Sequence, residues 1–403
     1  MSATSPFSSV DLAPRDPILG VNEAFAADTR TSKVNLGVGV YYNDEGKIPL
    51  LEAVKEAERL RLEAAQPRGY LPIEGLAAYD TAVQSMLFGT QAALLSSGRL
   101  VTAQALGGTG ALKIGADFLA RFNAGAKVLI SDPSWENHRT LFESAGFKVA
   151  TYPYYDAATH GVRFEAMLGT LREAPAGTVV VLHACCHNPT GVDLTEAQWR
   201  EVVAVVRERR LLPFLDIAYQ GFGDGIEPDG AAVRLFADFG VPFFVASSFS
   251  KSFSLYGERV GALTIVTSDK DEATRVMSQL KRVIRTNYST PPTHGASLVA
   301  AVLTTPALRQ MWETELAEMR ERIKAMRGAL VEGLKARGVT GDFSFILKQR
   351  GMFSYSGLTA EQVVRLQKDF GVYAVSSGRI CVAALNSRNV EHTCDAIAAV
   401  SNG

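Results

Sequence analysis

Residues 243–259 read FFVASSFSKSFSLYGER, an apolar run followed by a Ser-rich turn that carries a single lysine, Lys251. The apolar run is typical of a buried strand, and the turn begins where that strand should end. A lysine is usually a solvated surface charge. At the end of a buried strand, however, it loses hydration, which lowers the pKa of its amine and favours Schiff-base chemistry. Arg259 and nearby hydroxyls suit an anionic phosphate; the hydroxyls are those of Ser247, Ser248, Ser250 and Ser252.

Length and composition predict a globular protein of two domains. The chain has 403 residues, more than the ~250–300 at which a single core stops growing. Lys and Arg number 41 against 42 Asp and Glu, so no charge excess favours nucleic acid or a membrane surface. No apolar run approaches the ~18 residues of a transmembrane helix, and the N-terminus does not resemble a secretory signal. We therefore expect a cytoplasmic protein that binds neither nucleic acid nor membrane.

The chain has four cysteines, too few for a disulfide framework in a chain of this length. We expect free thiols in a reducing cytosol. Cys185, Cys186 and His187 are consecutive and could be taken for a metal site. Adjacent side chains diverge, however, and no CxxC or HxxxH pattern accompanies them, so we expect no metal.

A strand-like run ends at Leu106, a Gly-rich turn follows, and a helix is predicted to begin near Ala111. Backbone amides at a helix N-terminus bind phosphate, and here Gly108 and the hydroxyl of Thr109 would contribute. The turn lacks the third glycine of the dinucleotide-binding fingerprint and the GK[ST] of a P-loop. By itself it is a weak signal of a phosphate site.

Strand and helix patterns then alternate through the middle of the chain. The strand-like runs begin the segments KVLISDPSW (127–135), GTVVVLHACCHNPTG (177–191), LLPFLDIAYQGFG (211–223) and PFFVASSFSK (242–251), and GALTIVTS (261–268) is one more strand. A helix is predicted over 195–210, opened by a capping box at Thr195 and Gln198. This alternation predicts an α/β fold with a mostly parallel sheet flanked by helices, which binds ligands at the carboxyl ends of its strands. The candidate residues that follow strands are Trp135, Asn188, Asp216, Tyr219 and Lys251.

The flanking regions predict a smaller α/β domain. We expect a helix over 49–66 opened by Pro49, a long helix over 308–337, a strand-like stretch over 343–357, and helices over 359–370 and from Asn389. The first ~30 residues have little core character. Glycines 37 and 39 in the apolar run 34–40 indicate either a close approach to the backbone or a simple bend. The expected organisation is 1–48 as an N-terminal arm and part of the small domain, 49–310 as the large cofactor-binding domain, and 311–403 as the small domain.

Pyridoxal phosphate requires an amine for its aldehyde, an acid for its ring nitrogen, donors for its phenolic oxygen, a stacking face and a phosphate cup. Lys251 could be the amine and Asp216 the acid, because an aspartate ending an apolar strand is costly unless it meets a cation. Each residue also has an ordinary structural reading, such as a helix cap, a core aromatic or a turn, and only their convergence favours the cofactor. The remaining candidates are Tyr219 and Asn188 for the phenolic oxygen, Trp135 for stacking, and Gly108, Thr109, Ser248 and Arg259 for the phosphate.

Nearly the whole chain resembles the fold-type I, class I aminotransferases that depend on pyridoxal phosphate, and most closely their bacterial aspartate and aromatic amino-acid branch. The motifs are NLGVGVY, GGTGAL, DPSWENH, HNPTG, DIAYQGFG, SFSKSFSLYGERVG, RGMFSYSGL and SSGRICVA, in this order. The resemblance implies a ping-pong reaction of two half-reactions, in which Lys251 holds the cofactor and then moves a proton.

The resemblance also implies substrate contacts and a homodimer. Arg379 should pair with the substrate α-carboxylate, helped by Asn188 and the backbone at Gly39. Trp135 and Phe353 should line the substrate pocket, and His138 should lie behind Asp216. Two residues should reach the site from the neighbouring subunit: Arg285 for a side-chain carboxylate and Tyr70 for the cofactor phosphate.

Substrate preference is the finer question. Arg285 suits aspartate, glutamate and 2-oxoglutarate, whereas small or apolar residues at the pocket entrance favour aromatic side chains. The entrance residues are Tyr42, Ile48, Gly69, Leu71 and Pro72. We therefore expect a transaminase that accepts tyrosine, phenylalanine and tryptophan as well as aspartate and glutamate, with a predominantly aspartate-specific enzyme as the alternative. A β-lyase or decarboxylase on the same cofactor and a non-catalytic binding module are the competing classes.

Overall fold

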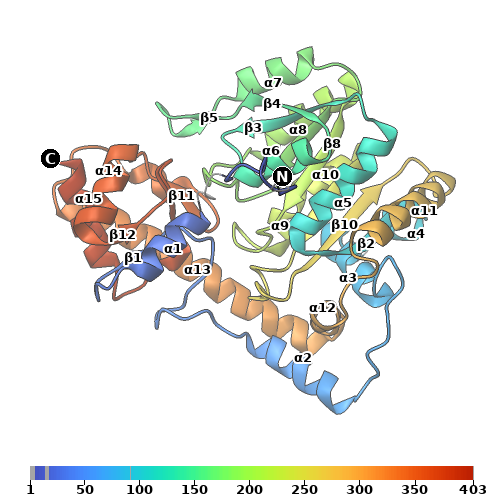
Figure 1. Cartoon of the computed structure of the whole chain (residues 1–403), viewed down its shortest axis with the longest axis horizontal. Coiled ribbons are helices and arrows are strands. Elements are labelled where there is room, and N and C mark those ends of the chain that lie inside the picture. The colour runs from blue at the N-terminus through green and yellow to red at the C-terminus, as the bar shows by residue number, and fades with distance from the viewer. Residues whose placement is uncertain (1–4, 14–17, 91, 403) are drawn as a thin grey trace.

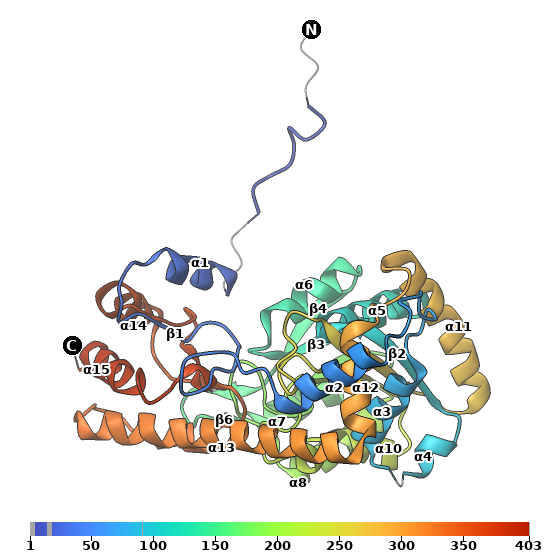
Figure 2. The same ribbon diagram turned by 90° about the horizontal axis from the view of Figure 1, so that it is seen from below.

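The computed structural model describes residues 5–13, 18–90 and 92–402. Residues 18–90 and 92–402 form two lobes (Figure 1), and residues 5–13 extend away from both (Figure 2). The larger lobe is built around a seven-stranded sheet, and the smaller lobe contains the C-terminal elements together with the segment that follows the N-terminus. Within the described residues, no helix has both the length and the apolar character that crossing a membrane would need.

The central sheet has the strand order β2-β10-β9-β8-β7-β3-β4. Neighbours from β9 to β4 pair in parallel, and β10 is antiparallel to both β9 and β2. The prediction of a mostly parallel sheet is confirmed. The strands are β2 (Leu100–Leu106), β3 (Lys127–Asp132), β4 (Lys148–Pro153), β7 (Val179–His183), β8 (Leu212–Ile217), β9 (Phe243–Ser248) and β10 (Val260–Val266).

Helices cover both faces of this sheet, which explains why its central strands are apolar on both sides. In β9, Phe243 and Val245 belong to one core, whereas Phe244 and Ala246 belong to the other. The helices of this lobe are α2 (Glu52–Glu63), α3 (Ala77–Phe88), α4 (Ala93–Ser96), α5 (Gly107–Phe122), α6 (Glu136–Ser144), α7 (Phe164–Glu173), α8 (Glu196–Arg209), α9 (Ile226–Asp229), α10 (Ala231–Asp238), α11 (Lys270–Asn287) and α12 (His294–Thr304).

The smaller lobe joins both ends of the chain, because β1 pairs in parallel with β12. The long helix α13 (Pro306–Ala336) runs from the larger lobe into the smaller one (Figure 2). The predicted domain limits stay a prediction, and the one between 310 and 311 falls inside this helix. The other elements here are α1 (Leu19–Ala27), β1 (Val34–Asn35), the 3-10 helix Ser344–Lys348, β11 (Phe353–Tyr355), α14 (Ala360–Arg365), the π-helix Leu366–Phe370, β12 (Val372–Tyr373), β13 (Arg379–Cys381), the 3-10 helix Val382–Ala384 and α15 (Val390–Ser401). A hairpin of the larger lobe, β5 (Tyr155–Asp156) and β6 (Gly161–Val162), completes the fold.

Several predicted boundaries are wrong. Helix α5 begins at Gly107 rather than near Ala111, because its glycines belong to the helix and allow it to approach the sheet: a Cβ on Gly108 would lie 3.1 Å from Cβ of Ser248. Pro49 lies before α2 instead of opening it. Of the strand-like stretch 343–357, only 353–355 is a strand. The predicted helix 359–370 changes from α to π geometry after Arg365.

Other predictions are confirmed. Thr195 and Gln198 form the expected capping box at the start of α8. The backbone at Gly39 is closely approached, since a Cβ there would lie 2.7 Å from Cζ of Phe353. Strand β1 covers only residues 34–35 of the apolar run 34–40 and a bend follows at 37–38, so both alternatives given for the two glycines, a close approach and a bend, occur.

Candidate active site

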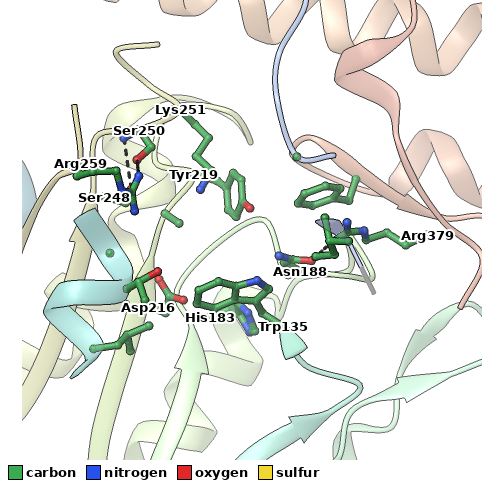
Figure 3. A pocket seen from close by; sticks show the side chains of 17 residues that line it. Trp135, His183, Asn188, Asp216, Tyr219, Ser248, Ser250, Lys251, Arg259 and Arg379 are labelled. Atoms are coloured by element: carbon green, nitrogen blue, oxygen red, sulfur yellow. Dashed lines mark hydrogen bonds between the residues drawn. The ribbon is translucent and has the colours of Figure 1, made fainter. Parts of the chain in front are cut away.

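A cavity of about 230 Å³ lies where the carboxyl ends of β7, β8 and β9 meet the smaller lobe (Figure 3). Its lining contains every residue predicted to bind the cofactor or the substrate carboxylate except Tyr70 and Arg285, but none of the predicted entrance residues Tyr42, Ile48, Gly69, Leu71 and Pro72. Lys251 and Tyr219 lie near the centre of the view, with Arg259 on one side and Arg379 on the opposite side (Figure 3). The predicted residues in the lining are Gly39, Gly108, Thr109, Trp135, Asn188, Asp216, Tyr219, Ser248, Lys251, Arg259, Phe353 and Arg379.

Lys251 stands three residues beyond the end of β9, where its amine faces the cavity. Its Nζ lies 5.1 Å from the centre of the Tyr219 ring. Burial lowers the pKa of Lys251 to about 8; Asp216 opposes this shift and Arg259 adds to it. A substantial fraction of the amine is therefore neutral at mildly alkaline pH, and a neutral amine is the form that attacks a carbonyl carbon.

Asp216 is a buried carboxylate near the end of β8. Its Oδ2 lies 2.9 Å from Nε2 of His138, and Nδ1 of His138 lies 2.9 Å from Oγ of Ser134. The expectation that His138 stands behind Asp216 is confirmed. Burial by itself raises the pKa of Asp216, but the hydrogen bond from His138 and the neighbouring imidazoles and Lys251 amine outweigh it, so the pKa lies below its ordinary value. The cavity thus holds an ionised carboxylate that favours a cationic partner.

One end of the cavity is an anion cradle. Gly108 and Thr109 present the first turn of α5, and Ser248 and Ser250 add hydroxyls. Arg259 donates from Nη1 to Oγ of Ser250 at 3.1 Å and packs so closely on Gly107, the first residue of α5, that a Cβ there would lie 2.4 Å from its Nη2. A helix N-terminus, two hydroxyls and a guanidinium form a suitable site for a phosphate group. Ser247 and Ser252, the other hydroxyls considered from the sequence, do not line the cavity.

The opposite end is formed by Arg379 of β13. Its Nη1 donates to Oδ1 of Asn188 at 3.2 Å and its Nη2 donates to the carbonyl of Gly37 at 2.6 Å. Its guanidinium stands 4.4 Å from the centre of the Phe353 ring. Arg379 is 1% exposed. Among the described residues, no carboxylate forms an ion pair with it and its Nε has no hydrogen-bond acceptor. A buried cation without a counter-charge is suited to bind a carboxylate.

The family model described as "Aminotransferase class I and II" matches residues 31–397. The chain belongs to this aminotransferase family. The enzyme is therefore a transaminase that depends on pyridoxal phosphate.

Relatives of this aminotransferase carry two kinds of name. The chain is 66% identical over 394 residues to an aspartate aminotransferase of Pseudomonas aeruginosa, covering 98% of this chain and 99% of that one. It is 53% identical over 397 residues to an aromatic-amino-acid aminotransferase of Escherichia coli, covering 98% and 100%. Among solved structures, the aromatic-amino-acid aminotransferase of Burkholderia pseudomallei covalently bound to pyridoxal phosphate matches with a TM-score of 0.97 at 69% identity, covering 99% and 100%.

The residues of this aminotransferase fit the cofactor of the family. The cradle would take the phosphate, the ionised Asp216 would take a protonated ring nitrogen, and Lys251 would take the aldehyde. The glycine at 108 supports the fit, because a side chain there would press on Ser248 and fill the cradle.

Sequence reasoning missed His183, which lines the cavity of the aminotransferase from the last position of β7. Burial lowers its pKa to about 3, and neither ring nitrogen has a hydrogen-bond partner among the described residues. The signal for it lies in the strand register, since His183 is paired with Asp216 across β7 and β8. Two groups of side chains have possible metal-ligand atoms within 4.8 Å of one another: His138, His183 and Asp216, and Cys185, Cys186 and Asp229. The expected absence of a metal therefore stays a prediction.

The structure does not bring Tyr70 and Arg285 to the cavity of their own chain. Tyr70 is 98% exposed, and Arg285 is exposed and hydrogen-bonds to Oγ of Ser289. Their expected contacts with a neighbouring subunit stay a prediction.

Proposed function

We propose that this transaminase transfers amino groups from aromatic and dicarboxylic amino acids to 2-oxo acids such as 2-oxoglutarate by a ping-pong reaction. The observation that carries the proposal is Arg379, a buried guanidinium with an unpaired Nε that shares one cavity with Lys251 and Asp216. A carboxylate anchor, an amine of lowered pKa and a buried acid are the groups that an amino acid and this cofactor require together.

Three residues act on the reacting atoms. Bound pyridoxal phosphate supplies an aldehyde for amines and a protonated ring that withdraws electrons from the substrate α-carbon. Lys251 would anchor the cofactor through its aldehyde and, as a free neutral amine, would accept a proton from the substrate α-carbon at Nζ, a role that its pKa of about 8 favours. Asp216 keeps the ring nitrogen protonated, with His138 supporting its charge. Tyr219 would donate a hydrogen bond to the phenolic oxygen, and burial raises the pKa of its hydroxyl, which keeps the proton on Tyr219.

The remaining residues hold and orient the cofactor and the substrate. Gly108, Thr109, Ser248 and Arg259 would hold the phosphate, and Trp135 would offer its indole for stacking on the ring. At the other end of the cavity, Arg379 would bind the substrate α-carboxylate together with Asn188 and the backbone at Gly39, and Phe353 would form the wall beside them. The contacts of Arg379 with Asn188 and with the Phe353 ring support this assignment.

A homodimer with shared active sites belongs to the proposal. Tyr70 would reach the partner's phosphate cradle, and Arg285 would bind a distal substrate carboxylate there. The exposure of both residues supports this assignment, because each is free to meet another chain. A cytoplasmic location is part of the same proposal, supported by four cysteines that are all free thiols.

The substrate range is tested by comparing kcat/KM for tyrosine and for aspartate, each with 2-oxoglutarate as acceptor. Names of both kinds among the relatives support dual specificity. Turnover of both donors is expected, and undetectable turnover of tyrosine would leave the aspartate-specific alternative. Release of one equivalent of oxo acid per site without an acceptor would separate transamination from a lyase or decarboxylase activity.

A further inference from the structure

The turn that carries Asn188 is held by a carboxylate outside the cavity. Asp193 accepts the backbone N–H of Cys186 at Oδ2 (2.7 Å) and that of His187 at Oδ1 (2.8 Å). Both oxygens of one side chain are thus used on two successive amides. Asp193 itself does not line the cavity.

This turn requires such a hold because its backbone is strained. Cys186 has a φ of +51°, a conformation that is unfavourable for a residue with a Cβ. Strained conformations of this kind persist only where the surrounding structure fixes them. Its side chain also packs against the smaller lobe, where a Cβ on Gly351 would lie 2.5 Å from Cβ of Cys186.

The ring of His187 fixes the same turn from the other side. Its Nε2 lies 2.9 Å from Oγ of Ser131, its Nδ1 lies 2.8 Å from Oγ1 of Thr190, and it stacks on Tyr154 at 4.0 Å. These contacts fix the side chain of His187, whereas Asp193 binds the two backbone amides that flank the strained Cys186, those of Cys186 and His187. The residue that follows this doubly held turn, Asn188, accepts a hydrogen bond from Nη1 of Arg379.

We infer that Asp193 is a positioning residue of the transaminase: by binding the amides of Cys186 and His187, it sets the position of Asn188 beside Arg379. It acts through Asn188 and touches neither substrate nor cofactor. This inference rests on the proposed role of Asn188 in binding the substrate carboxylate.

The carboxylate has the charge state that this role requires. Burial raises the pKa of Asp193 to about 6, although the amides of His187 and Cys186 oppose the shift. At pH 8 the side chain is ionised, and both oxygens accept. Asp193→Asn is nearly isosteric but turns an NH₂ group toward one of the two amides, so it removes half of the hold.

The test is a double-mutant cycle at pH 8 with the holoenzyme, comparing Asp193→Asn, Asn188→Ala and the double variant. Asp193→Asn should raise KM for tyrosine about tenfold, the effect of one weakened hydrogen bond to a charged group, and should lower kcat much less. In the Asn188→Ala background the same change should alter KM less than about twofold, because its effect passes through Asn188.

Glu315→Gln is the matched control. Like Asp193, Glu315 uses both carboxylate oxygens on two successive backbone amides, those of Glu52 at Oε1 (2.7 Å) and Ala53 at Oε2 (3.1 Å), but these amides lie at the start of α2 and Glu315 does not line the cavity. KM for tyrosine should stay within about twofold of wild type in this variant. An equal rise in KM for Asp193→Asn and Glu315→Gln would mean a general structural effect and would overturn the inference.

The outcomes separate the inference from the function on which it rests. If Asn188→Ala leaves KM unchanged, the proposed role of Asn188 is wrong. If Asn188→Ala raises KM but Asp193→Asn does not, or if the two effects add in full, Asp193 does not act through Asn188. Hydrogen exchange of the wild-type enzyme without substrate provides a readout that needs no variant: the amides of Cys186 and His187 should exchange at least ~10³-fold more slowly than exposed amides, and exchange at the exposed rate would overturn the inference.

Discussion

Replacing Arg379 by lysine should weaken the use of every amino-acid donor by the same factor. The guanidinium has five N–H groups in a planar fork, of which one is directed to Asn188 and one to the carbonyl of Gly37. Three remain for a carboxylate, including the unpaired Nε–H. A lysine ammonium has three donors in all, so it cannot satisfy both protein acceptors and also bind a carboxylate through two hydrogen bonds.

The magnitude follows from the one charged hydrogen bond that is lost. Such a bond contributes about 1.5–3 kcal/mol, which corresponds to a fall of roughly 10- to 150-fold in kcat/KM. Steady-state assays with tyrosine and with aspartate, each with 2-oxoglutarate, should give losses equal within about threefold, because both donors have the same α-carboxylate.

Arg322→Lys provides the control. Like Arg379, Arg322 donates to two acceptors, here the backbone carbonyls of Tyr42 and Leu385, and it lies 5.5 Å from an aromatic ring, that of Tyr41, but it does not line the cavity. It should change kcat/KM by less than about twofold. The reasoning is refuted if Arg379→Lys keeps kcat/KM within twofold of wild type, or if its loss is confined to one of the two donors.

Three further predictions address the cofactor, the pH dependence and the stability of the enzyme. Lys251→Ala should retain cofactor through the phosphate cradle but lose transamination by at least ~10²–10⁴-fold, measured as cofactor content and kcat; a near wild-type rate would contradict its role. Reconstitution of the apoenzyme with pyridoxal phosphate should accelerate as pH rises through about 8, because the neutral amine of Lys251 forms above its pKa. Asp216→Asn should move the midpoint of this rate profile to lower pH, since Asp216 raises the pKa of Lys251. A reconstitution rate independent of pH would refute this prediction. Thr195→Ala removes the capping box of α8 and should cost about 1 kcal/mol of unfolding free energy in denaturant titrations while kcat stays unchanged; equal stability would show that the cap contributes nothing.

The residues of the sheet edge could be predicted from the sequence because strand patterns indicate where strands end. Asp216 and Lys251 each follow an apolar run, and parallel strands bring such positions to one edge. The cavity confirms that prediction by placing both residues in its lining. Register is a different kind of information: that His183 lies beside Asp216 depends on how β7 pairs with β8, which no local pattern specifies.

The contribution of the smaller lobe could not be derived from local patterns. Arg379 meets Gly37 across 342 positions of sequence; the flanking patterns predicted that 1–48 is part of the small domain, but no local pattern predicted this contact. Asp193 follows a Pro-Gly turn in a short polar segment, where a carboxylate is usually solvated. Its hydrogen bond with the amide of Cys186 accompanies a positive φ at Cys186, which cannot be predicted from the sequence because the residue is not a glycine.

The antiparallel pairing of β10 with β9 has a consequence for residues 249–259. Strand β9 ends and β10 begins at the same end of the sheet. The amide of Phe249 donates to the carbonyl of Val260 at 3.0 Å, so a hydrogen bond closes the connection where it leaves the sheet. Lys251 lies near one end of this closed loop and Arg259 at the other. The length of the loop therefore fixes the distance between the Lys251 amine and the Arg259 guanidinium. We expect the loop to tolerate many substitutions between these two residues, but no insertion or deletion of even one residue.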